Sequence, residues 1–317
     1  MSARVLGNRT NVRHKLPVAV RAARAGLRVL SPASPALAAT IAERLFLTAT
    51  RHRRPAWERD ALDGATPLRV PHEGSFLPAW RWGEGTKTIV LVHGWEGRGS
   101  QMSAFVAPLL ERGFSVVTFD APGHGDAPSR FGSVVEHARG LASVVRFVGD
   151  VHGIVAHSVG GAAALLALHL GDVAVDRLAL VAPPVGPARF LAGFSRFLGL
   201  SPDVRRGVIA RLERRYGIPY AELDARLGAA GVDVPLLVVH DEGDDVVPFE
   251  DGAAIAAAAK RGRVVSTRGL GHRRVLRAPE VIDAVVPFIA AGAPGEASAF
   301  ARTIDGELFY RERRWAS

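Results

Sequence analysis

The chain has 317 residues, of which 48% are hydrophobic and 22% charged, and it contains no cysteine. Such a length and composition are typical of a globular protein with a sizeable core. The lack of cysteine excludes disulfides, thiolate metal sites and a cysteine nucleophile. The net charge is +9, but residues 1–60 hold 12 basic and 3 acidic residues and the remainder holds 28 of each. Because the basic excess belongs to the N-terminal segment, we expect no nucleic-acid partner.

Residues 1–60 predict a basic helical extension ahead of the main body. Two helical segments, 16–30 and 35–50, are separated by a Ser-Pro-Ala-Ser-Pro stretch. In the second segment, apolar residues recur every four positions and form a stripe. Two interpretations fit: the extension packs on the main body, or it is a basic amphipathic element that contacts a membrane surface or a partner. The stripe consists of Leu37, Ile41 and Leu45.

The sequence also bears on location. No apolar run reaches the roughly 18 to 20 residues of a membrane span. Arg21, Arg24 and Arg28 interrupt the candidate hydrophobic region near the N-terminus, which argues against a cleavable signal peptide. We therefore expect a cytoplasmic protein, with peripheral membrane association through residues 1–60 as the alternative.

From residue 67 onwards, short apolar runs alternate with helical stretches. Strands that are apolar on both faces and separated by helices indicate a parallel sheet covered by helices on both sides. The first two runs read as a short hairpin. We therefore predict an α/β fold over residues 61–317, with a mostly parallel central sheet flanked by helices. The expected strands are 68–70, 76–82, 88–92, 115–119, 153–156, 178–181, 235–239 and 263–266, and the expected helices lie near 101–112, 133–148, 159–171, 249–260 and 278–290.

Residues 183–232 interrupt this alternation with helical patterns and no convincing strand. We interpret them as a small helical cap over the sheet edge. Phe190, Phe194 and Phe197 give the cap an apolar face. The arginines between positions 205 and 215 either are solvated or bind a carboxylate or phosphate of the substrate. In the tail from Gly292, aromatic residues indicate packing against another part of the chain; they are Phe309, Tyr310 and Trp315.

Ser158 is the residue that points most clearly to chemistry. It stands between an apolar run that ends at Ala156 and two glycines that open an Ala/Leu-rich stretch. This pattern predicts a strand, a sharp turn and a helix, which hold the hydroxyl at the sheet edge beside a helix N-terminus. A hydroxyl placed there is a nucleophile if a base lies nearby. Taken alone, Ser-x-Gly-Gly also fits ordinary helix capping.

Other loops that follow predicted strands carry reactive side chains as well. Parallel α/β proteins place their sites at this edge of the sheet, so we expect these loops to meet. The loops begin at His93, Asp120, Asp241 and Gly269 and read His-Gly, Asp-x-x-Gly-His-Gly, a loop containing Asp-x-x-Val-Pro, and Gly-x-Gly-His.

With these loops in this order, residues 67–290 resemble the α/β-hydrolase fold superfamily. The resemblance implies that Ser158 is the nucleophile and His272 the general base. It implies Asp244 as the acid, because Val-Pro follows it at the spacing of the family motif. The chain departs from the family at Ala156, where a glycine is usual, and we expect the tight turn to form with alanine.

Further roles follow from the same resemblance. The oxyanion hole falls on the backbone N–H groups of Trp95 and Val159, and Asp241 and Asp245 remain the alternatives to the expected acid. We interpret His93 and His124 as structural, and His157 as a residue that lines or braces the pocket. No His/Asp cluster has metal-ligand spacing, so we predict neither a metal nor a cofactor.

The function implied is that of a serine hydrolase which cleaves a carboxylic ester of a small or medium apolar substrate through an acyl-enzyme. Peptidase, thioesterase and acyltransferase activities on the same residues stay open, because fold does not fix function. A different class is a non-catalytic hydrolase-like protein whose N-terminal segment binds a membrane or a partner.

Overall fold

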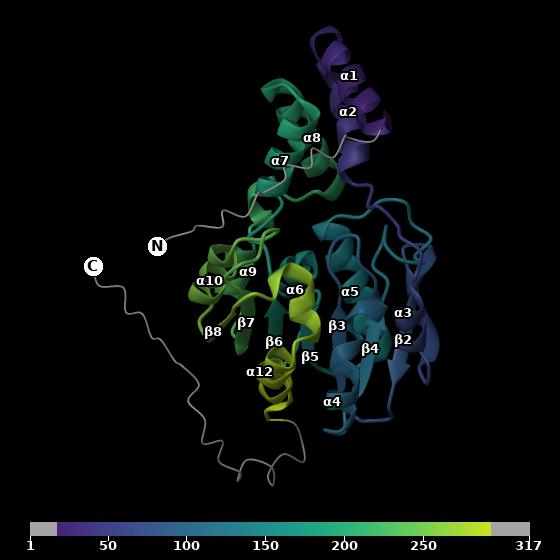
Figure 1. The fold of residues 1–317 in the computed structure, drawn as a ribbon, viewed down its shortest axis with the longest axis vertical. Helices are drawn as coiled ribbons and strands as arrows, with labels where there is room; N and C mark the ends of the chain where they lie inside the picture. The colour runs from purple at the N-terminus through teal and green to yellow at the C-terminus, as the bar shows by residue number, and fades with distance from the viewer. Residues whose placement is uncertain (1–17, 293–317) are drawn as a thin grey trace, which may run out of the picture.

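The computed structural model describes residues 18–292, which form an eight-stranded sheet flanked by helices (Figure 1). The strand order is β1-β2-β4-β3-β5-β6-β7-β8. β2 pairs antiparallel with β1 and β4, and the other pairings within these residues are parallel. The eight predicted strands and the predicted fold class are confirmed. The strands are β1 (Thr66–His72), β2 (Ser75–Trp82), β3 (Thr88–Val92), β4 (Ser115–Phe119), β5 (Val151–His157), β6 (Arg177–Val181), β7 (Leu236–Asp241) and β8 (Gly262–Thr267).

Helices cover both faces of the sheet. Side chains of β3 alternate between two cores, Val90 and Val92 facing one and Ile89 and Leu91 the other, as the period of a strand requires. The first core lies under α5, α6, α9 and α10, and the second lies under α4 and α12. These helices are α4 (Val106–Leu110), α5 (Val134–Val148), α6 (Val159–His169), α9 (Ala225–Gly231), α10 (Phe249–Ala258) and α12 (Pro279–Ala290).

One expected helix differs in form. Residues 101–112 were predicted as a single helix, whereas a 3-10 helix, η1 (Gly99–Phe105), precedes α4. The first turn of η1 is anchored from outside, because the Gly99 N–H donates to Asp120 Oδ1 and the Ser100 hydroxyl donates to Glu58 Oε2. A short 3-10 helix of this kind is common at the start of an α-helix.

The residues of the predicted cap are helical, and the N-terminal helices pack beside them. The helices α1, α2, α7 and α8 lie together at one end of the molecule, at the top of Figure 1, and we call this group the lid. The placing of the domain boundary at residue 60 stays a prediction. The lid helices are α1 (Val18–Ala33), α2 (Pro35–Phe46), α7 (Ala188–Leu198) and α8 (Pro202–Tyr216), and the short elements nearby are α3 (Ala56–Asp60) and η2 (Tyr220–Leu223).

A buried carboxylate joins the two parts of the lid. Glu43 of α2 is 1% exposed and accepts hydrogen bonds from Arg211 and Arg215 of α8, the latter at 2.8 Å from Arg215 Nε. Two of the cap arginines, although partly exposed, are therefore paired with a carboxylate of the chain itself. They hold the N-terminal helices on the cap.

The face of α2 that packs is not the apolar stripe. The stripe residues Leu37, Ile41 and Leu45 are 50%, 37% and 41% exposed. The opposite face is rich in alanine and packs against α8 so closely that a Cβ added to Gly207 would lie 2.9 Å from the Ala39 Cβ. Small side chains permit this close approach of two helices, so the larger apolar side chains of the stripe are left facing outward.

The segment between α2 and β1 is also tied to the sheet edge. The Arg54 guanidinium lies 3.2 Å from Asp120 and 2.8 Å from Asp126. A second, buried pair joins Glu58 of α3 to Arg98, at 2.9 Å. Since both pairs link the N-terminal region to loops around the predicted site, that region is part of the site's support.

Two expectations concern regions or properties beyond these elements. No helix within residues 18–292 is long and apolar enough to cross a membrane. The predicted packing of Phe309, Tyr310 and Trp315 falls outside the described residues.

Candidate active site

Ser158 occupies the sharp turn between β5 and α6. Its backbone angles are φ 53° and ψ −128°, a strained conformation for a residue with a side chain. The turn is so crowded that a Cβ added to Gly160 would lie 2.5 Å from the carbonyl oxygen of His93. Ala156 is fully buried in β5, and the turn forms with alanine at that position. The predicted strand, turn and helix are therefore present.

Ser158, His272 and Asp244 are brought together from three loops. The Ser158 Oγ lies 3.0 Å from His272 Nε2, and His272 Nδ1 lies 2.7 Å from Asp244 Oδ2. The three side chains are almost completely buried, with the Asp244 side chain fully so. In this arrangement the hydroxyl can donate its proton to the imidazole, while the imidazole donates its other N–H to the carboxylate.

Asp244 is held as a carboxylate by several donors. Its Oδ1 accepts from the backbone N–H groups of Val246 and Val247, at 2.8 and 2.9 Å. Burial raises the pKa of Asp244, but hydrogen bonds from His240, His272 and these two N–H groups outweigh it and hold the pKa well below its usual range. The group therefore stays ionised beside His272.

His240 is a residue of the site that sequence reasoning missed. It is the last residue but one of β7, its Nε2 donates to the Val247 carbonyl oxygen at 3.0 Å, and the same nitrogen lies 3.4 Å from Asp244 Oδ2. A Cβ on Gly252 would lie 2.3 Å from its Nδ1, so the ring is closely enclosed. Its place at the end of an apolar strand, just before an acidic loop, was the signal available in the sequence.

The two alternative acids take other places. Asp241 is fully buried and accepts from Thr267 Oγ1 at 3.0 Å and from the Leu270 N–H at 2.9 Å, which braces the loop that carries His272. Asp245 is exposed. Within the described residues, the carboxylate that contacts His272 is that of Asp244.

The loop after β3 brings the predicted oxyanion donors to the serine. A Cβ added to Gly94 would lie 2.8 Å from Ser158 Cβ, so the loop backbone passes directly beside the hydroxyl. Trp95 follows Gly94, and its N–H has no acceptor among the described residues. The Val159 N–H opens α6 and belongs to the first turn, where N–H groups lack intrahelical acceptors. Both groups are available to a substrate oxygen.

Three buried, neutral histidines, namely His93, His124 and His137, pack together and support the loop after β3. His93 uses both nitrogens, since Nδ1 donates to the Gly94 carbonyl oxygen at 2.7 Å and Nε2 accepts the Ala121 N–H at 3.0 Å. Its ring packs against those of His124 and His137, with centroids 5.5 and 5.3 Å away. Burial lowers the pKa of His93 to about 3 and that of His124 to about 4. The expected structural role of His93 and His124 fits this packing.

His157 lies under the imidazole of His272. Its Nε2 donates to the backbone carbonyl oxygen of His272 at 2.9 Å, and the two ring centroids are 4.8 Å apart. Burial, followed by the proximity of His272, lowers the pKa of His157 to about 3. A neutral His157 therefore braces the backbone of His272, in line with the expectation that it lines or braces the pocket.

The serine faces a large cavity between the sheet edge and the lid. The cavity has a volume of about 1260 Å³, whereas pockets for drug-sized ligands are roughly 300 to 1,000 Å³. Its lid side is mainly apolar and aromatic, and Phe46 of α2 meets Phe194 of α7 there with ring centroids 5.3 Å apart. Side chains of the lid that line the cavity include Leu45, Phe46, Phe190, Phe194, Phe197 and Tyr216.

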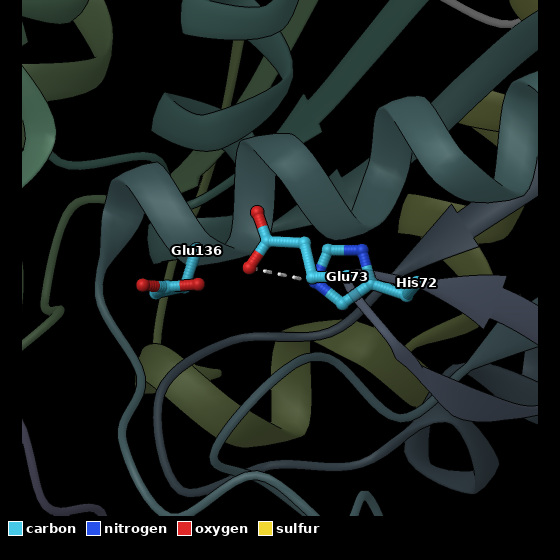
Figure 2. A group of neighbouring side chains, drawn as sticks. All are labelled: His72, Glu73 and Glu136. Atoms are coloured by element: carbon cyan, nitrogen blue, oxygen red, sulfur yellow. Dashed lines mark ion pairs between the residues drawn. The ribbon is translucent and has the colours of Figure 1, made fainter.

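One cluster outside the cavity has ligand-type side chains. His72, Glu73 and Glu136 approach one another at the turn between β1 and β2 (Figure 2), with ligand atoms within 4.8 Å. A guanidinium nitrogen of Arg139 already lies 3.7 Å from Glu73, and His72 Nδ1 hydrogen-bonds Ser143 Oγ at 2.9 Å. Because these contacts account for the cluster, we assign no metal to it.

Comparisons with known proteins identify a matching family profile and several relatives. The profile of the alpha/beta hydrolase family matches residues 89–285, a stretch that contains Ser158, Asp244 and His272. A bifunctional esterase/perhydrolase from Acinetobacter calcoaceticus is 27% identical over 253 residues, which cover 64% of this chain and 91% of that protein. A pimeloyl-(acyl-carrier protein) methyl ester esterase from Methylococcus capsulatus is 31% identical over 248 residues, which cover 64% of this chain and 89% of that protein.

A solved structure shares the fold. An esterase of Pyrococcus furiosus aligns with a TM-score of 0.59 and 18% sequence identity, covering 77% of this chain and 98% of that one. The helices α1, α2 and α3 precede the stretch matched by the family profile.

Proposed function

The chain belongs to the alpha/beta hydrolase family, and we propose that it is a serine hydrolase which cleaves carboxylic esters through an acyl-enzyme. The proposal rests on two consecutive hydrogen bonds. One joins Ser158 Oγ to His272 Nε2 at 3.0 Å, and the other joins His272 Nδ1 to Asp244 Oδ2 at 2.7 Å. A serine hydroxyl is a weak nucleophile without a base, and this arrangement supplies one.

The first half of the reaction forms the acyl-enzyme. His272 takes the Ser158 proton as the oxygen attacks the ester carbonyl, and the negative charge that develops on the carbonyl oxygen is stabilised by the N–H groups of Trp95 and Val159. Asp244, which stays ionised, stabilises the imidazolium and holds its tautomer. His272 then gives the proton to the departing alcohol.

The second half releases the acid. Water takes the place of the alcohol and His272 removes its proton, so that the resulting hydroxide attacks the acyl carbonyl. The bond to Ser158 Oγ breaks, and the proton returns to the serine. No net proton is consumed by the protein, and the products are an alcohol and a carboxylic acid.

The cavity supports an apolar acyl or alcohol group of medium size. Its lid side is lined by leucine and phenylalanine side chains, and burying apolar area there contributes favourably to binding, at about 25 cal/mol per Å². Relatives named as esterases point to the same bond type. We therefore propose esters with a medium-length apolar chain as substrates.

Covalent labelling with a fluorophosphonate probe tests the nucleophile. Wild-type protein should be labelled, and Ser158→Ala should not. Ser133→Ala is the matched control, because Ser133 lines the same cavity and caps α5. Absence of labelling in folded wild-type protein would contradict the serine mechanism, and labelling that survives in Ser158→Ala would assign the nucleophile to another residue.

A further inference from the structure

Exposed apolar side chains gather around the mouth of the cavity. Among residues 18–292, twelve large apolar side chains are more than a third exposed, and five of them line the cavity. Two more, Leu37 and Ile41, continue the row of Leu45 along α2. Apolar side chains concentrated in this way mark an interaction site. These seven residues, which we call the mouth surface, are Leu37, Ile41, Leu45, Trp57, Phe190, Phe197 and Val246.

Positive charge surrounds the mouth surface. Arg53, Arg273, Arg274 and Arg277 line the same cavity and are exposed. The described lining contains two acidic residues. Glu58 is 2% exposed and paired with Arg98, and Glu96 is half-buried. The rim of the cavity is therefore both apolar and basic.

Three of the four lid helices extend the same character outward, whereas α8 also carries the exposed Asp203. Glu43 is the one acidic residue within the described helices α1, α2 and α7, and it is only 1% exposed because it is buried in its ion pair. Arg28, Arg44 and Arg196 on these helices are exposed. Exposed acids do occur near the ends of the mouth surface, at Asp60 and Asp245, but α1, α2 and α7 present exposed apolar side chains and arginines without one. This face of the lid is complementary to an interface that offers hydrocarbon below a layer of negative charge.

From this pattern we propose that the mouth surface docks on an anionic lipid bilayer, with the cavity open toward the lipid. The apolar side chains enter the headgroup region, and the arginines pair with lipid phosphates. A second copy of the chain fits less well, because a two-fold dimer would place the same basic rim against itself. Docking rests on exposure and charge alone, and entry of an ester from the bilayer rests on the proposed function.

Co-sedimentation with vesicles tests the docking. We compare vesicles of phosphatidylcholine with an equal mixture of phosphatidylcholine and phosphatidylglycerol. Wild-type protein should bind the mixed vesicles at least about tenfold more tightly, and high salt should weaken the binding. The double variant Leu37→Glu/Ile41→Glu, whose residues lie outside the cavity lining, should lose about tenfold or more of this affinity, since it places two carboxylates at the interface.

A matched double variant guards against a general effect of added charge. Phe147→Glu/Leu170→Glu changes side chains that are 48% and 46% exposed and that do not line the cavity. It should bind vesicles like wild type, and thermal unfolding shows whether each variant is folded. Equal loss in both double variants, or no binding by folded wild-type protein, would overturn the proposal.

A third outcome would assign a different partner to the mouth surface. A dimer that dissociates in Leu37→Glu/Ile41→Glu, without vesicle binding by wild type, would identify the occupant as a second copy and overturn the lipid proposal. Hydrolysis of a water-soluble short-chain ester is measured in parallel. Its absence would contradict the proposed function and leave the docking result interpretable.

Discussion

Glu43 and Arg215 stand 172 positions apart in the chain, yet Arg215 Nε lies 2.8 Å from Glu43 Oε1 in the lid. Although burial raises the pKa of Glu43, hydrogen bonds from Arg215 and Arg211 lower it below its usual value. The carboxylate thus stays ionised and joins α2 to α8. The N-terminal helices form one lid with the cap because of this contact and the alanine face beside it.

Glu43→Gln should loosen that lid. Two guanidinium groups lose their carboxylate, and since hydrogen bonds to charged groups contribute about 1.5 to 3 kcal/mol, we expect the free energy of unfolding to fall by about 2 kcal/mol. Denaturant unfolding measures the change, and limited proteolysis should show faster cleavage within residues 18–55. Glu222→Gln, an exposed acid of the cap, should behave as wild type. The same change in both variants would argue against the ion pair.

Asp244→Asn should nearly abolish ester hydrolysis. In the proposed mechanism the amide cannot stabilise the imidazolium and favours the wrong tautomer of His272, so we expect kcat to fall on the order of 10⁴-fold. Asp245→Asn is the matched control, because Asp245 is the adjacent acid and is exposed. Steady-state kinetics on a soluble ester would separate the two, and similar losses in both variants would speak against Asp244 as the acid.

His157 should act as a positioning residue. His157→Leu removes the hydrogen bond to the His272 carbonyl, and since a neutral hydrogen bond contributes about 1 kcal/mol, kcat should fall roughly five- to tenfold. KM should change little, because His157 acts by holding the backbone of His272 and not by binding the substrate. His157→Gln retains an N–H donor and should recover part of kcat. A loss confined to KM would contradict this role.

The sheet followed from local patterns in the sequence, and the three central residues followed from loop motifs that resemble those of a known family. Most strands that lead to the site contain a short apolar run, although β8 also holds Arg263, Ser266 and Thr267, and each loop carries its motif within a few positions of the strand end. Ser158, Asp244 and His272 could therefore be named without knowledge of packing. The role of the three residues in catalysis is still a proposal, which the labelling and kinetic experiments test.

What the sequence did not reveal depends on contacts between distant segments. The outward direction of Leu37, Ile41 and Leu45 depends on the alanine face of α2, which only α8 makes the better packing surface. Glu43 could not be paired with Arg215, because no local rule links positions so far apart. His240 was passed over for a similar reason, since its partner emerges only when the loop after β7 folds back.

Acid should destabilise the protein through four buried histidines. Their folded pKa lies at about 3 or 4, or well below the usual value, while the unfolded value is about 6.5. Between these values only the unfolded chain binds the protons, so stability is complete above about pH 6.5 and is lost as the pH falls toward 4. Each histidine should contribute a slope of about 1.4 kcal/mol per pH unit. The four are His93, His124, His137 and His157.

Urea unfolding between pH 8 and 5 measures this slope. His124→Gln should reduce it by about 1.4 kcal/mol per pH unit, because one buried proton acceptor is removed. His169→Gln is the control, since His169 is exposed. If the two variants show the same slope as wild type, burial of His124 is not the source of the acid sensitivity.

Phe194 should set the acyl-chain length that the cavity accepts. Phe194 of α7 meets Phe46 of α2 across the lid side of the cavity, with ring centroids 5.3 Å apart. A buried methylene contributes about 0.8 kcal/mol, so kcat/KM should rise roughly fourfold per methylene until the space is filled. Phe194→Ala enlarges that space and should move the optimum to longer chains, while lowering kcat/KM for short ones that lose their contact.

A series of p-nitrophenyl esters of increasing chain length measures both effects. Phe147→Ala, which removes a 48% exposed ring on α5 away from the cavity, should leave the profile unchanged. A uniform loss across all lengths in Phe194→Ala would indicate damage to the lid rather than a longer pocket, and an unshifted optimum would place the chain elsewhere in the cavity. Because Glu43 and its arginines help to hold α2 on the cap, Glu43→Gln should broaden the same profile.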